Sequence, residues 1–147
     1  MNKGHEFGYQ KFTTLQISSL VKVCLLLKKK YKIKKQNILG HSDIAPLRKK
    51  DPGEYFPWRK LSRNGIGIWY PTLKSRFKKI KNKKIRNIFF KNLYKIGYRY
   101  FDLRVSKKTD KKIVESFKAK FSNNKIDGLI DEKTLNISHY LTSSMKN

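Results

Sequence analysis

Residues 40–53 read GHSDIAPLRKKDPG, so a histidine, basic residues and two aspartates stand within one short segment. His41 follows Asn37-Ile38-Leu39-Gly40, a short apolar run that is typical of a buried strand. Asp51 comes ten residues later, across a proline-containing turn. An imidazole nitrogen and a carboxylate oxygen that converge on one point are good zinc ligands. The segment therefore predicts a metal site at a strand end, although an ordinary hydrogen-bonded His–Asp pair fits the same pattern.

Lys49 stands two residues before Asp51. A lysine there would place its own ammonium group beside the pair, near an oxygen on which negative charge develops during a reaction. Lys49 is therefore the candidate catalytic residue.

The residues upstream predict a helix that covers this strand. Thr13 or Thr14 can cap it, and Lys28 to Lys30 suit its last turn. Its apolar stripe consists of Ile17, Leu20, Val21, Cys24, Leu27 and Tyr31. Because Cys24 falls inside the stripe, we expect a buried small hydrophobe rather than a reactive thiol. Residues 1–12 are expected to form the end of a strand and a loop. The predicted helix, followed by the strand at residues 37–40, indicates an α/β layer.

Three further regions follow. Residues 41–71 are rich in proline and glycine, which indicates a long functional loop. Residues 72–85 form a basic linker, and residues 86–147 contain three short helical patterns. The predicted domains are therefore 1–71 and 86–147, joined by 72–85.

Composition excludes several classes of protein. The net charge of +26 indicates affinity for anionic surfaces, but 29 of the 36 basic residues are lysine. Proteins that read bases depend more on arginine, so no specific nucleic-acid partner is expected. No apolar run reaches the length of about 18 residues that a transmembrane helix needs, and the first 30 residues lack the pattern of a signal peptide. A single cysteine excludes an internal disulfide and a multi-cysteine zinc site.

The motif at residues 40–53, with Phe56-Pro57-Trp58 and Gly65-Ile66-Gly67 after it, resembles the C-terminal half of the zinc-dependent N-acetylmuramoyl-L-alanine amidases, the amidase type 2 family. Residues 2–9 resemble the segment that follows the central strand of that family, so the resemblance covers about 2–71. Leu47 departs from the glycine that many members carry. The resemblance implies an α/β fold class, with a truncated mixed-sheet amidase domain before a small all-α C-terminal three-helix domain.

The resemblance also implies roles and an activity. His41 and Asp51 match two of the three zinc ligands of the family, and Lys49 matches the lysine thought to stabilise the tetrahedral intermediate. The implied cofactor is Zn²⁺. The implied reaction is hydrolysis, by a zinc-activated water, of the amide between N-acetylmuramic acid and L-alanine in peptidoglycan or muropeptides. Phe56, Trp58 and Trp69 are expected either to shape the cleft or to fill the core.

Two residues of the family pattern have no match. The remaining zinc histidine and the catalytic glutamate would fall upstream of Met1. His5 and Glu6 are substitutes by residue type only, and His139 is expected at the surface. The chain is therefore read either as a fragment or as a degenerate amidase kept for wall binding.

The C-terminal patterns Leu93–Tyr98, Ile113–Phe121 and Lys125–Thr134 resemble the small three-helix peptidoglycan-binding domain. The Asp127-Gly128 turn and an Asp131 helix cap fit a binding role, but they are explained equally well if these residues only build the fold. The leading hypothesis is an amidase in the cell envelope or periplasm, with the cytoplasm as the alternative compartment. A catalytically inactive peptidoglycan-binding protein is the second hypothesis, and a basic nucleic-acid binder is the third.

Overall fold

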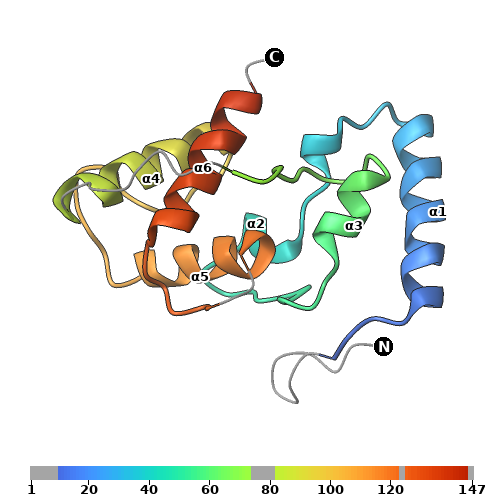
Figure 1. Cartoon of the computed structure of the whole chain (residues 1–147), viewed down its shortest axis with the longest axis horizontal. Coiled ribbons are helices and arrows are strands. Elements are labelled where there is room, and N and C mark those ends of the chain that lie inside the picture. The colour runs from blue at the N-terminus through green and yellow to red at the C-terminus, as the bar shows by residue number, and fades with distance from the viewer. Residues whose placement is uncertain (1–9, 74–81, 123–124, 146–147) are drawn as a thin grey trace.

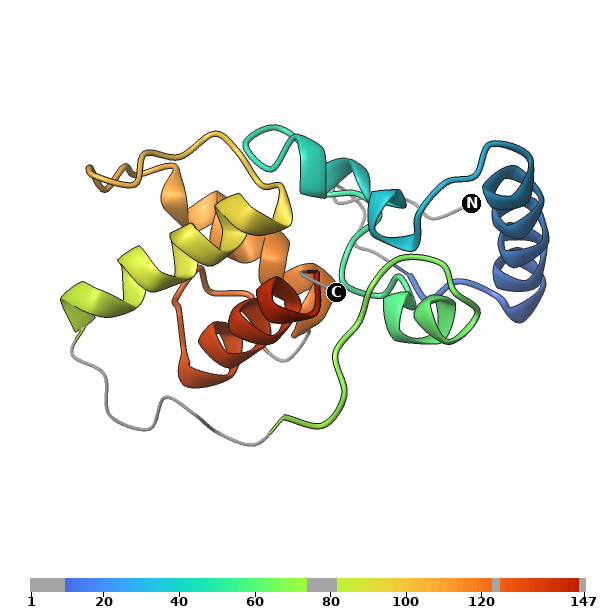
Figure 2. The ribbon, with the colours of Figure 1, turned by 90° about the horizontal axis from the view of Figure 1, so that it is seen from above.

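The computed structural model describes residues 10–73, 82–122 and 125–145. Their secondary structure consists of the elements α1 (Thr14–Lys30), η2 (Lys35–Asn37), α2 (His41–Ile44), α3 (Trp58–Arg63), α4 (Asn82–Ile96), α5 (Asp110–Phe121) and α6 (Glu132–Ser144). Figures 1 and 2 show α1 and α3 at one end of the molecule and α4 at the other, with α2 between them. None of the described helices is long and apolar enough to cross a membrane.

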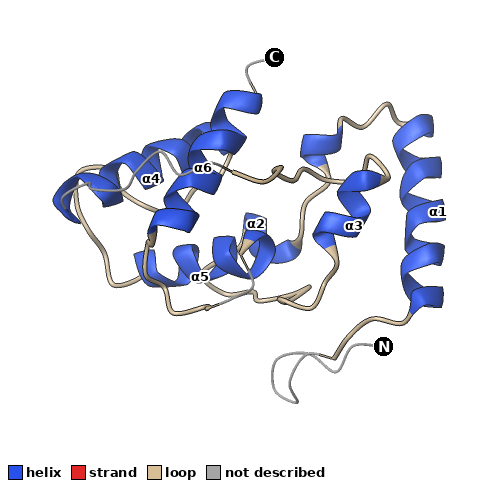
Figure 3. Cartoon of the chain, viewed as in Figure 1, coloured by secondary structure: helices blue, strands red, loops and turns tan. Residues whose placement is uncertain are grey.

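The prediction of an α/β fold with a truncated mixed sheet is wrong, because no described residue forms a strand (Figure 3). Ile38 and Gly40 do have extended backbones, with φ/ψ of −94/105° and −83/161°. A strand also needs a neighbouring chain to complete its ladder of hydrogen bonds, and no described segment supplies one beside residues 38–40. His41 is consequently the first residue of α2 rather than the end of a strand. The strand expected before residue 10 lies outside the described residues.

The helix predicted after Thr13 is confirmed as α1. Thr13 Oγ1 accepts a hydrogen bond from the Gln16 amide at 3.2 Å, and Gln16 Oε1 accepts one from the Thr13 amide at 2.9 Å. These reciprocal bonds form a capping box, which satisfies two amides that the helix leaves free. The predicted stripe is buried only near its start, at Ile17, and Tyr31 is exposed. Cys24 is half-buried rather than buried, and this partial burial raises the pKa of its thiol.

Two apolar clusters organise the described residues. The smaller consists of Ile17, Trp58, Leu61 and Ile66, which joins α1 to α3. The larger is built from α4, α5 and α6, around side chains such as Phe89, Phe117 and Leu141. Leu47 and residues 68–70 pack against the larger cluster. The proline- and glycine-rich segment therefore contacts the C-terminal helices directly.

The three predicted C-terminal helices are present. Asp131 caps α6, since its Oδ1 accepts a hydrogen bond from the Thr134 amide at 2.7 Å. Gly128 has a φ of +70°, which is the left-handed conformation that the turn before α6 requires. Residues 74–81 of the predicted linker lie outside the described residues.

Candidate functional site

The structure brings His41 and Asp51 together. His41 Nδ1 lies 3.3 Å from Asp51 Oδ2, and the two side chains are 45% and 55% exposed. Backbone contacts produce this approach, because the Ser42 amide donates a hydrogen bond to Asp51 O at 2.9 Å. The segment thus closes on itself, and both polar side chains face solvent at its rim.

The separation of the two atoms fits a shared metal ion. Two atoms that bind one tetrahedral zinc at about 2.0–2.2 Å lie about 3.3–3.6 Å from each other. A direct charge-assisted hydrogen bond would be shorter, at about 2.7–2.9 Å. The observed 3.3 Å is compatible with two ligands of a common ion, and it equally fits an ordinary His–Asp pair.

A complete ligand set is not found among the described residues, where no group of three or more His, Cys, Asp or Glu could hold a metal. His5 and Glu6 lie outside the described residues. His139 is half-buried on α6 and belongs to no such group. The described part of the chain therefore supplies two candidate ligands.

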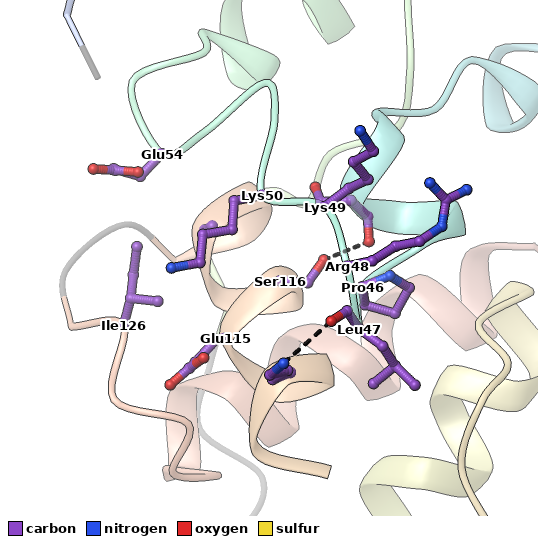
Figure 4. A pocket seen from close by; sticks show the side chains of 12 residues that line it. Pro46, Leu47, Arg48, Lys49, Lys50, Glu54, Glu115, Ser116 and Ile126 are labelled. Carbon is purple, nitrogen blue, oxygen red and sulfur yellow. Dashed lines mark hydrogen bonds between the residues drawn. The ribbon is translucent and has the colours of Figure 1, made fainter. Parts of the chain in front are cut away.

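Lys49 lies in the turn between these ligands. Its amide donates to Ala45 O at 2.9 Å, which continues the turn begun by α2. Its half-buried side chain lines a cavity of about 550 Å³, beside Arg48 and Lys50 (Figure 4). Lys49 is thus two residues from Asp51 along the chain and at the edge of a cavity large enough for a ligand.

Gly40 is required by close packing at the start of α2. A Cβ at this position would lie 2.8 Å from Pro52 Cδ and 3.2 Å from Trp58 Cζ2. The first contact would force neighbouring atoms to shift, and the second is tighter than most Cβ contacts in proteins. The absence of a side chain at Gly40 therefore lets residues 51–52 approach α2 and places Asp51 beside His41.

A buried polar cluster anchors α2 from behind. Asp43 accepts three hydrogen bonds: from the Gly40 amide at 2.7 Å, Tyr98 Oη at 2.5 Å and Lys120 Nζ at 2.6 Å. The Lys120 and Asp43 side chains are only 4% and 3% exposed. Lys120 Nζ also lies 4.2 Å from the centre of the Trp58 ring, a cation–π contact. We call Asp43, Tyr98 and Lys120 the Asp43 cluster.

Burial in the Asp43 cluster changes the acid–base properties of its members. Burial lowers the pKa of Lys120, and the nearby Asp43 carboxylate opposes this change. Burial raises the pKa of Tyr98 well above its ordinary value, and Asp43 adds to the increase by its charge and hydrogen bond. Tyr98 is therefore held as a neutral hydrogen-bond donor.

Two further hydrogen bonds join α5 to the same segment. Ser116 Oγ donates to Ser42 O at 2.7 Å, and Lys112 Nζ donates to Leu47 O at 3.2 Å (Figure 4). Ser42 directly follows His41. The C-terminal helices thus hold both the helix that carries His41 and the turn that leads to Asp51.

The Asp43 cluster was not predicted from the sequence. Asp43 stands in the quoted motif, but its partners are 55 and 77 residues away along the chain. Lys120 is surrounded by lysines in the sequence, and no local pattern distinguishes a buried one. Of the aromatic residues left open by the sequence, Trp58 is buried in the smaller core and Trp69 stacks on Tyr70 at 5.0 Å. Phe56 packs edge-on against Trp58, so these aromatics belong to the packing.

Similarity to proteins of known activity is concentrated in the segment that carries the site. Residues 1–54 match the family model described as N-acetylmuramoyl-L-alanine amidase. N-acetylmuramoyl-L-alanine amidase AmiD of Escherichia coli is 43% identical over 61 residues, which are 42% of this chain and 22% of AmiD. The 1,6-anhydro-N-acetylmuramyl-L-alanine amidase AmpD of Haemophilus influenzae is 48% identical over 52 residues, which are 35% of this chain and 28% of AmpD.

Structural similarity extends over nearly the whole chain. The E. coli AmiD structure, solved with the substrate anhydro-N-acetylmuramic acid-L-Ala-D-gamma-Glu-L-Lys, matches 93% of this chain and 55% of its own length, with a TM-score of 0.79 and 25% identity. AmpDh3 of Pseudomonas aeruginosa matches 99% of this chain and 60% of its own length, with a TM-score of 0.84 and 23% identity, which shows a shared fold. The chain therefore spans little more than half of these structures. Its first 54 residues match the model of the N-acetylmuramoyl-L-alanine amidase family, which confirms the resemblance predicted from the motif at residues 40–53.

Proposed function

We propose that this chain takes part in hydrolysis of the amide between N-acetylmuramic acid and L-alanine in peptidoglycan or its fragments. The observation that carries the proposal is the 3.3 Å approach of His41 to Asp51, within the segment that matches the amidase family. The similarity to AmiD, whose structure holds an anhydromuramoyl tripeptide, supports the same substrate class.

In this proposal, the side chains of His41 and Asp51 would hold Zn²⁺. When bound, zinc lowers the pKa of a coordinated water and polarises a carbonyl group. Lys49, two residues before Asp51, would offset negative charge on the carbonyl oxygen of the substrate. The Gly40 packing and the Asp43 cluster keep both ligands in position.

The proposal is tested by incubating the purified chain with anhydro-N-acetylmuramoyl tripeptide and increasing Zn²⁺, with released tripeptide measured by mass spectrometry. His41→Ala and Asp51→Ala are each expected to abolish zinc-dependent release. Lys49→Met is expected to lower kcat about 100-fold or more, as for loss of one group that stabilises an oxyanion. Lys91→Met, an exposed change on α4, is the matched control. Full activity of both ligand variants would refute the assignment.

A second candidate function is peptidoglycan binding without catalysis. Catalytic zinc sites ordinarily have three protein ligands, whereas the described residues supply two candidates. The helices α4–α6 support it as well, by their resemblance to a peptidoglycan-binding domain. Sedimentation with purified sacculi, with no tripeptide released at saturating Zn²⁺, would favour this function over the first.

We propose the cell envelope as the compartment for either function, because peptidoglycan would be the ligand of both. Immunodetection after osmotic shock tests this location. Recovery of the protein in the spheroplast lysate alone would contradict it and would favour the cytoplasm.

A further inference from the structure

The helix α1 is apolar on two opposite sides. Ile17, on the side that joins the smaller core, is 4% exposed, whereas Leu15 and Leu26 are 76% and 66% exposed. Leu26 comes nine residues after Ile17 and eleven after Leu15. At 3.6 residues per turn, Leu26 therefore lies opposite Ile17 and on the same side as Leu15. A helix at the surface of a protein normally has one apolar side, so the second apolar side of α1 is a candidate binding surface.

The place of α1 in the fold leaves this second side open within the described part of the chain. Figures 1 and 2 both show α1 at one edge of the molecule, with α2 and α3 on the same side of it. Lys28, which shares the side of Ile17, donates a hydrogen bond to Gly65 O at 2.8 Å and so fixes α1 to the turn after α3. The side opposite Ile17 is therefore held facing away from these elements.

The charged residues on this side of α1 are all positive. Residues 10–40 contain eight lysines and no arginine, aspartate or glutamate. Three of these lysines are exposed and lie three or four residues from Leu26, which makes them its neighbours on the helix surface. A lysine can lay its aliphatic stem along an apolar surface while its ammonium group stays in a polar layer. We call these residues the outer face of α1: Leu15, Lys22, Leu26, Lys29 and Lys30.

We propose that the outer face of α1 binds the surface of a membrane that contains anionic phospholipids. Leucines flanked by lysines are typical of helices that lie in the interface of such a membrane, where the lysines meet lipid phosphates. A protein that covered Leu26 would also have to bury Lys22 and Lys30 on either side of it, at a large cost without acidic partners. A second copy of the chain would bring like charges together. The outer face runs along the helix from residue 15 to residue 30, so the axis of α1 lies parallel to the membrane.

This inference does not depend on the catalytic proposal. It adds a contact with lipid to the contact with peptidoglycan that both candidate functions require. Figures 1 and 2 show α4 at the opposite end of the molecule from α1. With α1 on the membrane, α4 therefore lies on the side of the molecule away from the lipid.

The experiment measures sedimentation of the full chain with vesicles of equal parts phosphatidylglycerol and phosphatidylcholine. Leu26→Gln and Lys29→Gln change the outer face, and Leu129→Gln and Lys91→Gln are matched controls at exposed positions outside α1. Leu26→Gln is expected to weaken binding about tenfold, because the leucine leaves water when the membrane is bound. Lys29→Gln is expected to weaken binding about fivefold, as for one lysine near an anionic membrane surface. Both controls are expected to bind as the unaltered chain does.

Further probes separate a membrane from other occupants of the outer face. Vesicles of phosphatidylcholine alone are expected to bind at least about tenfold more weakly, because they lack the negative charge that attracts lysines. Binding of double-stranded DNA is expected to weaken in Lys29→Gln but not in Leu26→Gln, since leucine has no part in neutralising phosphates. Leu15→Gln is a second variant of the apolar part, and thermal unfolding followed by circular dichroism checks that each variant is folded.

Two results would overturn the inference. If folded Leu15→Gln and Leu26→Gln bind the anionic vesicles as tightly as Leu129→Gln does, the leucines do not enter the membrane and only a charged surface remains. If sedimentation velocity of the lipid-free chain shows a dimer that Leu26→Gln dissociates, the outer face joins two copies of the chain instead.

Discussion

Replacement of Lys120 by methionine tests whether the Asp43 cluster holds the candidate site together. The side chains of Lys120 and Asp43 are 4% and 3% exposed, and their charged atoms are 2.6 Å apart. Methionine fills much of the same volume without the charge, so the variant leaves the Asp43 carboxylate buried without its cation. Removal of one partner of a buried ion pair destabilises a protein by about 3–5 kcal/mol.

The structure places the expected value near the lower end of that range. Asp43 keeps two hydrogen bonds, from the Gly40 amide and from Tyr98. The variant also loses the cation–π contact of Lys120 with Trp58, but methionine still packs against the ring. We therefore expect a loss of about 3 kcal/mol in the free energy of unfolding. With a urea dependence of about 2 kcal/mol per molar, the unfolding midpoint falls by about 1.5 M.

The assay is urea unfolding followed by tryptophan fluorescence, since Trp58 lies against Lys120. A double-mutant cycle with Asp43→Asn isolates the pair, and we expect a coupling energy of about 2 kcal/mol. Lys91→Met, on the exposed face of α4, is the control and should change stability by less than about 0.5 kcal/mol. A loss below about 1 kcal/mol for Lys120→Met, or no coupling, would show that the buried pair does not anchor α2.

Three other perturbations address neighbouring features. Gly40→Ala places a Cβ 2.8 Å from Pro52 Cδ, so we expect about 1–3 kcal/mol of destabilisation in urea unfolding and weaker zinc binding by calorimetry; unchanged values for both would contradict the packing argument. Because the pKa of Tyr98 is raised in the folded state, its contribution to stability is fully present below pH about 10. This contribution is lost as the pH rises through the pKa of the folded state. In urea titrations at stepped pH, the free energy of unfolding of the unaltered chain should therefore exceed that of Tyr98→Phe by less above pH 10 than below it. A difference that stays constant with pH would argue against this role of Tyr98. The hydrogen bond from Lys118 holds the pKa of Asp127 well below its usual range. The contribution of Asp127 to stability is therefore present above pH about 4 and is lost on acidification. In a plot of melting temperature against pH, Asp127→Asn should flatten the decrease at acid pH, and an identical decrease would refute this role.

The parts of the fold that were predictable depend on local pattern. The helix after Thr13 was predictable because its cap and its three- and four-residue spacing lie within a few turns. The approach of His41 to Asp51 is likewise a short-range event, closed by a backbone bond between residues 42 and 51. The predicted strand at residues 37–40 failed because extended backbone becomes a strand only beside a partner, and no short pattern reports whether a partner exists.

The parts that escaped prediction depend on contacts between distant residues. Lys120 is buried because it bonds to Asp43, which is 77 residues away along the chain. In a chain with 29 lysines, the residues next to Lys120 do not indicate that this lysine is buried. The spacing in α1 correctly predicted a helix but not its environment, since Tyr31 at the end of the predicted stripe is 61% exposed and Ile17 at its start only 4%. Periodicity indicates which residues share a face, whereas burial of that face depends on what the rest of the molecule places against it.

The contacts around α2 also bear on how the two predicted domains function together. Residues 42, 43 and 47 all bond to side chains from residues 98–120, through Ser116, Tyr98, Lys120 and Lys112. These bonds hold the residue after His41 and the turn before Asp51, so the C-terminal helices fix the geometry of both candidate ligands. The same face of α5 then forms one wall of the cavity that Lys49 lines. A helical module that only tethered the chain to a wall would need none of these bonds, and their presence argues that α5 is part of the site itself.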